Sequence, residues 1–176
     1  MSVEIQRDAE PTPEWAIGEA RARIQAALGD TFPVAGELLI EIADNITESG
    51  GEARAEEDRI LFDYEKMKLS LQESEDILVA EGYIEPGERT KVLPDIKDKR
   101  WSSLVYDMVH ELAHVIDGKM SGDKYERLDP KLAPTKYGKR NAREAFAEAF
   151  TYWVFGQPVD PEAERAIKEV LSNEKV

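Results

Sequence analysis

The chain has 176 residues, of which 41% are hydrophobic and 34% are charged, and it carries a formal net charge of −14. This length suits one domain with its own hydrophobic core, and the composition is typical of a folded chain rather than a disordered one. The negative charge argues against nucleic acid or an anionic membrane as the main partner, and the lack of cysteine excludes disulfides and thiolate metal sites.

The beginning of the chain shows no apolar stretch behind a basic region, and we therefore identify no secretory signal there. We expect residues 1–12 to be flexible. No run of apolar residues approaches the length of a membrane span. Cytoplasmic residence is the default expectation, although a chain exported by another route would have the same sequence. Residues 1–176 are predicted to form a single domain.

The first half of the chain is predicted to contain a helix, two strands and a second, short helix. Pro13 is typical of a first helical turn and Gly29 of a helix end, which predicts a helix that reaches about residue 27. Aliphatic residues over 34–43 and the segment 59–64 predict two strands that pair as a hairpin or within a sheet. Residues 74–81 then predict a short helix.

A strongly helical pattern follows from residue 101 to about residue 117. Its apolar residues fall on one broad arc, which we expect to pack against the core. The opposite arc is polar, and we expect it to face a cleft. This polar arc carries His110, His114, Asp107 and Asp117, with Glu111 at its edge.

The last part of the chain is predicted to hold two further helices. Residues 118–140 contain several Gly and Pro and predict an irregular connection. Residues 141–155 predict a helix whose polar side carries Glu144 and Glu148, which are four residues apart and therefore neighbours on its surface. Residues 161–172 predict a final amphipathic helix.

The only two histidines of the chain stand in one short motif, His110-Glu111-Leu112-Ala113-His114. Residues four apart on a helix share a face, and neutral imidazole is a common metal ligand, so both side chains can converge on one Zn²⁺. Glu111 between them can act as general base toward a metal-bound water. The motif predicts a catalytic zinc centre. The alternative is that both histidines are solvated polar residues of a helix.

A catalytic zinc site needs a third protein ligand, and this chain can supply only a carboxylate. A metzincin would place the ligand six residues after His114, where Met120 stands, so that class is excluded. Asp117 lies one turn from His114 and is better suited to accept a hydrogen bond from a ligand or to cap the helix. Glu144 or Glu148 could supply the third ligand from a crossing helix, and the spacing does not choose between them.

Two segments, residues 109–117 and 137–150, resemble the catalytic domain of anthrax lethal factor and the related Pro-Pro endopeptidases. The second segment shares a Tyr-Gly pair, an Asn, a Glu and a Phe-Ala-Glu-Ala-Phe run. The resemblance implies that Glu144 is the third zinc ligand and that Glu148 supports the site one turn later. It also implies that Tyr137 stabilises the developing oxyanion or assists the leaving amine.

The resemblance further implies an α+β, zincin-like fold in which a small mixed sheet packs on the motif helix and a second helix carries the third ligand. The catalytic core would span about residues 34–156. Two departures from the family are a shorter connection between the matching segments and Ala113 in place of a common Gly. Because the connection shapes the cleft, the family's substrate preference cannot be transferred to this chain.

We therefore expect a zinc endopeptidase whose substrate is a polypeptide, with an acidic surface that favours a basic or extended segment. The strand at 34–43 or the one at 59–64 would lie at the sheet edge and pair with the substrate. One alternative is a non-catalytic zinc-binding or interaction module of the same fold within a toxin or phage particle. Another is a peptidase that trims DNA–protein crosslinks, which the acidity disfavours. The substrate sequence, the biological role and the oligomeric state stay open.

Overall fold

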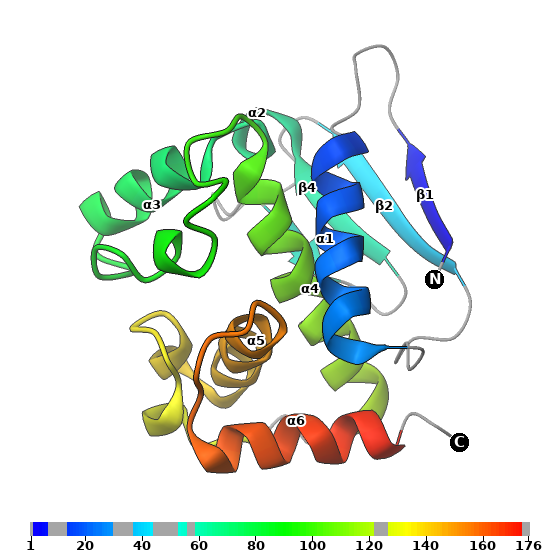
Figure 1. Ribbon diagram of the computed structural model, residues 1–176, viewed down its shortest axis with the longest axis vertical. Coiled ribbons are helices and arrows are strands. Elements are labelled where there is room, and N and C mark those ends of the chain that lie inside the picture. Colours follow the sequence, from blue (N-terminus) through cyan, green and yellow to red (C-terminus); the bar gives the residue numbers. More distant parts are fainter. Residues whose placement is uncertain are drawn as a thin grey trace.

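The computed structural model describes residues 2–6, 14–29, 37–43, 53–55, 59–121 and 127–173. Helices dominate these residues, and one small sheet lies at one side (Figure 1). The helices are α1 (Glu14–Leu28), α2 (Tyr64–Met67), α3 (Leu71–Ala80), α4 (Ser102–Ser121), α5 (Ala142–Val154) and α6 (Pro161–Asn173), with 3₁₀ turns η1 (Thr90–Val92), η2 (Pro130–Leu132) and η3 (Gly138–Arg140). The strands are β1 (Ser2–Gln6), β2 (Glu37–Ala43), β3 (Ala53–Ala55) and β4 (Arg59–Asp63).

The sheet has the strand order β1-β2-β4-β3 and is mixed, since β3 alone runs antiparallel to its neighbour. The two predicted strands exist as β2 and β4 and pair with each other, with Ile40 opposite Ile60. Their pairing is parallel, so the predicted hairpin is wrong. Parallel neighbours need a connection that brings the chain back to the end of the sheet where the first strand began. The segment between β2 and β4 is long enough for this return, and it contains β3.

Two further expectations about the sheet are corrected by this order. The strands β2 and β4 both lie inside the sheet, so neither is the edge strand that we predicted to meet a substrate. The edges are β1 and β3. Residues 2–6, which were expected to be flexible, form β1 and pair in parallel with β2. The remainder of the segment 1–12 lies outside the described residues.

Helix α4 is the central element of the fold. It packs against α1, α3, α5 and α6, and it also contacts β3 and β4 (Figure 1). All residues from 102 to 117 are buried, including those of the predicted polar arc. The expected polar front therefore does not face open solvent, because other parts of the chain cover it. The helix also ends at Ser121 and not near residue 117, so Asp117 lies inside the helix.

The surrounding helices follow from ordinary local signals. In α1 the buried residues recur every three or four positions, and Gly29 adopts a left-handed φ of 61° just after the helix, as the sequence predicted. Helix α3 begins three residues before the predicted start, because Ser70 and Glu73 form a capping box. Within the described part of the chain, no helix combines the length and the apolar character needed to cross a membrane.

Candidate metal centre

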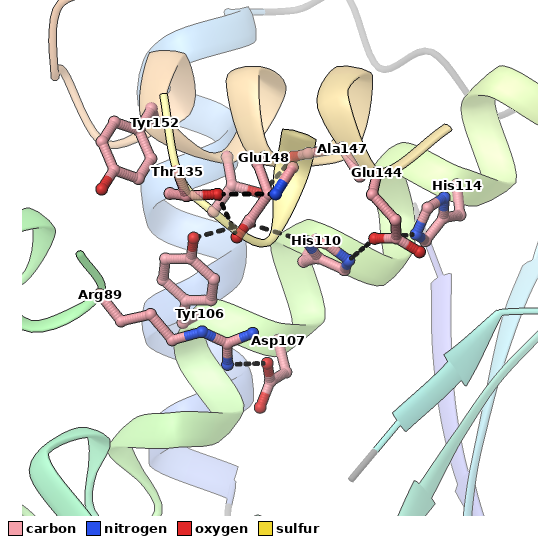
Figure 2. A network of polar contacts seen from close by, with 12 residues as sticks. Arg89, Tyr106, Asp107, His110, His114, Thr135, Glu144, Ala147, Glu148 and Tyr152 are labelled. Carbon is pink, nitrogen blue, oxygen red and sulfur yellow. Dashed lines mark hydrogen bonds and ion pairs between the residues drawn. The ribbon is translucent and has the colours of Figure 1, made fainter. Parts of the chain in front are cut away.

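Three side chains with metal-binding atoms meet where α4 and α5 pack together (Figure 2). The Nε2 atom of His110 lies 3.1 Å from Oε2 of Glu144, and Nε2 of His114 lies 3.3 Å from the same oxygen. The two imidazole rings come from successive turns of α4, with centroids 4.9 Å apart and nearly perpendicular planes. His110, His114 and Glu144 thus form a group that could hold a metal ion.

The spacing of these atoms fits a bound metal ion. Two ligand atoms held at about 2.0–2.1 Å from one tetrahedral Zn²⁺ lie about 3.3 Å apart. The two distances from Glu144 to the imidazole nitrogens, 3.1 and 3.3 Å, match this separation. Two nitrogens and one oxygen also suit zinc chemically. The Glu144 side chain is 19% exposed, more than either histidine, so solvent reaches the group from the Glu144 side.

The position of Glu144 is fixed by the start of α5. The Asn141 side chain caps this helix and accepts a hydrogen bond of 2.9 Å from the backbone N–H of Glu144. Glu144 therefore stands in the first turn, where the helix dipole favours a carboxylate. Glu148 follows one turn later and faces α4 as well. The Phe146 and Phe150 rings on the remaining surface of α5 are buried in the core.

Glu148 is fully buried and does not face the two Nε2 atoms. Its Oε2 lies 3.1 Å from Nδ1 of His110 and accepts a hydrogen bond of 2.6 Å from the Tyr106 hydroxyl (Figure 2). Its Oε1 accepts a bond of 3.0 Å from the Thr135 hydroxyl, which itself accepts from the backbone N–H of Gly138. A histidine that binds metal through one nitrogen commonly donates its other N–H to a carboxylate. Glu148 is placed for that role toward His110.

The charges of this cluster are strongly coupled. Burial opposes protonation of His110, but hydrogen bonds to Glu144 and Glu148 outweigh it and raise the His110 pKa well above its usual value. Burial also opposes the charged forms of Glu144 and Glu148, yet their contacts with the imidazoles lower the pKa of both carboxyls. Two carboxylates around a buried imidazole are a negative environment, which suits a cation.

The predicted catalytic base, Glu111, lies between the two histidines on α4 and is 9% exposed. Burial raises its pKa, while the neighbouring charges of His110 and His114 act in the opposite direction. A carboxylate with a raised pKa in a dry position accepts a proton more readily than an exposed one. The environment of Glu111 therefore suits a general base.

Tyr137 lies beside the same group, just before η3. Its ring centroid lies 6.0 Å from that of the His110 ring and 4.9 Å from the Arg140 guanidinium. Burial, and next the charge of Glu144, raise the pKa of the Tyr137 phenol. The phenol therefore stays protonated and can donate a hydrogen bond near the metal group.

Asp117 is not one of the three residues whose ligand atoms group together; burial raises the pKa of its carboxyl, and the charges of Arg127 and His114 act in the opposite direction. Its carboxylate pairs with Arg127, and it lies inside α4 and caps no helix end. The Nδ1 atom of His114 is buried and has no hydrogen-bond partner among the described residues. Among the described residues, a carboxylate thus contacts Nδ1 of His110 but not Nδ1 of His114.

Sequence reasoning missed several residues that build this centre. Tyr106 and Thr135 hold Glu148, and the Arg89 guanidinium pairs with Asp107 at 3.0 Å and stacks over the Tyr106 ring at 4.7 Å. Tyr106 could have been found, because it lies four residues before His110 on the same helix face. Thr135 and Arg89 carry no such local signal, since both reach the site through tertiary contacts.

Gly138 packs so closely against Ala133 and Glu148 that a larger residue would not fit without a shift of its neighbours. A Cβ atom there would stand 2.8 Å from Cβ of Ala133 and 3.2 Å from Cβ of Glu148. We expect Gly138→Ala to lower the free energy of unfolding by about 1–3 kcal/mol, as overpacked substitutions do. Gly18→Ala is the matched control, because nothing lies within 4 Å of its added Cβ and it stands inside α1. That control should raise stability by roughly 0.5–1 kcal/mol. Urea unfolding of both variants measures the difference, and equal effects would contradict the tight contact.

Comparisons of the chain with protein-family models, with curated proteins and with solved structures give no match. The resemblance described above therefore depends on the residues of the two segments alone.

Proposed function

We propose that the protein is a zinc-dependent endopeptidase. The observation that carries the proposal is the grouping of His110, His114 and Glu144, whose ligand atoms lie within 4.8 Å of one another, with the buried Glu111 carboxyl close enough to feel the charges of both histidines. Three protein ligands of this kind leave one position for water or substrate, which is the arrangement of catalytic zinc sites. A purely structural site would be closed by a fourth protein ligand.

In this proposal His110, His114 and Glu144 hold the ion, and Glu148 orients the His110 ring through Nδ1. Zinc, when bound, supplies Lewis acidity that acidifies a water molecule and polarises a peptide carbonyl. Glu111 accepts a proton from the attacking water while the water oxygen bonds to the peptide carbonyl carbon. Glu111 then returns that proton to the peptide nitrogen, so that the C–N bond breaks and an amine and a carboxylic acid leave.

Tyr137 supports the same reaction from the loop before α5. Its phenol keeps its proton because burial raises its pKa. A protonated phenol donates a hydrogen bond to negative charge that develops on the carbonyl oxygen. The Tyr137 and His110 rings are in edge-to-face contact, with centroids 6.0 Å apart, which places the phenol beside the proposed ligand group.

The strand most suited to guide a substrate is β3. It is an edge of the described sheet, and it contacts α4, which carries the motif. An extended peptide that adds itself to such an edge gains backbone hydrogen bonds that do not depend on its sequence. We infer that a substrate would lie along β3 and pass the zinc ligands in extended form.

A digest of a randomised peptide library tests the proposal. We expect zinc-loaded protein to cleave the library, metal-free protein prepared with a chelator to be inactive, and added zinc to restore cleavage. Zinc content is measured in parallel by elemental mass spectrometry. Cleavage that survives metal removal would overturn the proposal. Stoichiometric zinc without any cleavage would favour the non-catalytic module instead.

A further inference from the structure

A small basic pocket opens beside the candidate metal centre. It has a volume of about 290 Å³ and is lined by Gly82, Tyr83, Lys136, Lys139 and Arg140. All three cationic residues are exposed, and the lining contains no carboxylate. The chain has 37 acidic and 23 basic residues, so a concave site whose charged lining residues are all cations runs against its overall charge.

Two of the three cations of this pocket are not paired: among the described residues, no ion pair joins Lys139 or Arg140 to a carboxylate. Lys136 is paired, with its ammonium 3.6 Å from the Glu85 carboxylate and its backbone N–H donating to the Glu88 carboxylate. The Arg140 guanidinium contacts two rings, with its carbon 5.4 Å from the centroid of Tyr83 and 4.9 Å from that of Tyr137. Stacking of this kind orients a guanidinium while leaving its N–H groups available for an anion.

The pocket is tied to the centre by a firmly held turn. Lys139 and Arg140 belong to η3, whose Gly138 packs on Glu148 and donates its N–H to Thr135. The Tyr137 ring lies between Arg140 and His110, at 4.9 Å from the guanidinium and 6.0 Å from the imidazole. At about 3.3 Å per residue of extended chain, these two distances together correspond to at most about three residues of a bound peptide.

We propose that this pocket binds a carboxylate of the peptide substrate, two or three residues from the bond that is cleaved. The inference rests on the proposed endopeptidase function and adds a substrate class to it. The carboxylate can come from an Asp or Glu side chain or from the C-terminus of the peptide. A planar guanidinium held by ring contacts, with the Lys139 ammonium next to it in the chain, can pair with the two oxygens of either group. The local charge thus favours an acidic substrate position, in contrast to the basic segment expected from the net charge.

Two libraries of acetylated decapeptides separate these sources, one with amidated and one with free C-termini. With zinc-loaded protein we expect about threefold or greater enrichment of Asp and Glu at one position two or three residues from the cut, or cuts at that fixed distance from a free C-terminus. The double variant Lys139→Gln/Arg140→Gln should lose this dependence. Arg165→Gln/Lys168→Gln on α6 removes the same charge elsewhere and should keep it.

A binding measurement gives a readout that does not require cleavage. Zinc-loaded Glu111→Gln protein is titrated with three tripeptides: acetyl-Ala-Glu-Ala-amide, acetyl-Ala-Ala-Ala with a free C-terminus, and acetyl-Ala-Gln-Ala-amide. Amide resonances of Gly82 and Lys139 report binding in the pocket by NMR. We expect at least one carboxylate peptide to bind about fivefold more tightly than the Gln peptide, and this difference to vanish in the Lys139→Gln/Arg140→Gln background.

The outcomes separate the pocket from the proposed activity. Equal affinities for the three tripeptides, together with cleavage that ignores carboxylates, would overturn the pocket and leave the endopeptidase proposal standing. Carboxylate-dependent shifts at Gly82 and Lys139 without cleavage of either library would overturn the endopeptidase proposal and leave the carboxylate site standing.

Discussion

Glu111→Gln is expected to keep its zinc and to lose peptide cleavage by roughly a hundred- to ten-thousandfold, the usual contribution of general base catalysis. The amide preserves the size of the side chain but cannot accept a proton at neutral pH. Because Glu111 is not among the atoms that converge on the metal position, its replacement leaves His110, His114 and Glu144 in place. Cleavage rates and bound zinc, measured on the same preparation, give both halves of the result.

Glu75→Gln serves as the control for Glu111→Gln. Glu75 is likewise buried, and its carboxylate accepts hydrogen bonds from the Arg89 and Thr90 backbone N–H groups. Its replacement should cost some stability but leave zinc content and cleavage unchanged. Cleavage within tenfold of the wild-type rate in Glu111→Gln would mean that another group is the base. Loss of zinc in that variant would mean that Glu111 contributes to metal binding.

The second large effect is expected at Glu144. If about 10–16 kcal/mol of zinc binding is shared among four ligands, one ligand contributes about 3 kcal/mol or more. Glu144→Gln should therefore weaken zinc binding by roughly a hundredfold or more. Because Glu144 is 19% exposed and stands in the first turn of its helix, the metal-free protein should remain folded. Competition with a chromophoric chelator measures the affinity, and circular dichroism checks the fold.

Glu148→Gln is the matched variant one turn further along α5. It removes an ionised acceptor from Tyr106, Thr135 and His110 and should destabilise the metal-free protein by about 1–3 kcal/mol. Its zinc affinity should fall only about tenfold, as for other residues that orient a ligand. Glu144→Gln should thus cause the larger loss of zinc affinity, and Glu148→Gln the larger loss of stability in the metal-free protein. Equal zinc loss in both would contradict the separate roles of the two carboxylates.

Much of the helical part of this fold could be predicted from the sequence, because the signals are local. The periodicity over 101–117, the Gly at position 29 and the Asn before α5 each act within a turn or two of the helix that they define. The group His110, His114 and Glu144 was accessible for a related reason. Two of its members share one helix face, and elimination of other residue types left a carboxylate, Glu144 or Glu148, for the third; the choice of Glu144 came from the resemblance of the second segment.

The sheet was less predictable, because strand pairing depends on contacts between distant segments. The pattern identified β2 and β4 but not the direction of their pairing, which depends on the path of the chain between them. The three residues of β3 are too few for a periodic signal, and Ala and Arg give little strand preference. In β1, apolar and polar residues do alternate, with Glu4 between Val3 and Ile5, but five residues are a short pattern at the start of a chain.

The burial of the polar arc of α4 was also beyond local reasoning. Asp107 and Asp117 have the sequence signature of a solvent-facing stripe, but each is covered and paired with an arginine, Arg89 or Arg127, from another part of the chain. A carboxylate in a helical pattern does not reveal whether its partner is water or a distant guanidinium. Such pairs become visible only when the tertiary structure is known.

The single carboxylate of Glu148 limits how this protein can diverge. Tyr106, Thr135 and His110 all contact it; Tyr106 and His110 lie one turn apart on α4, and Thr135 comes from a distant part of the chain. An apolar substitution at position 148 would remove the carboxylate partner of three polar side chains in the interior at once. Drift at this cluster would therefore require concerted replacement, such as a phenylalanine at 106 and an aliphatic residue at 135 together with the loss of the acid. Descendants that retain the acid are expected to inherit its three partners as one unit.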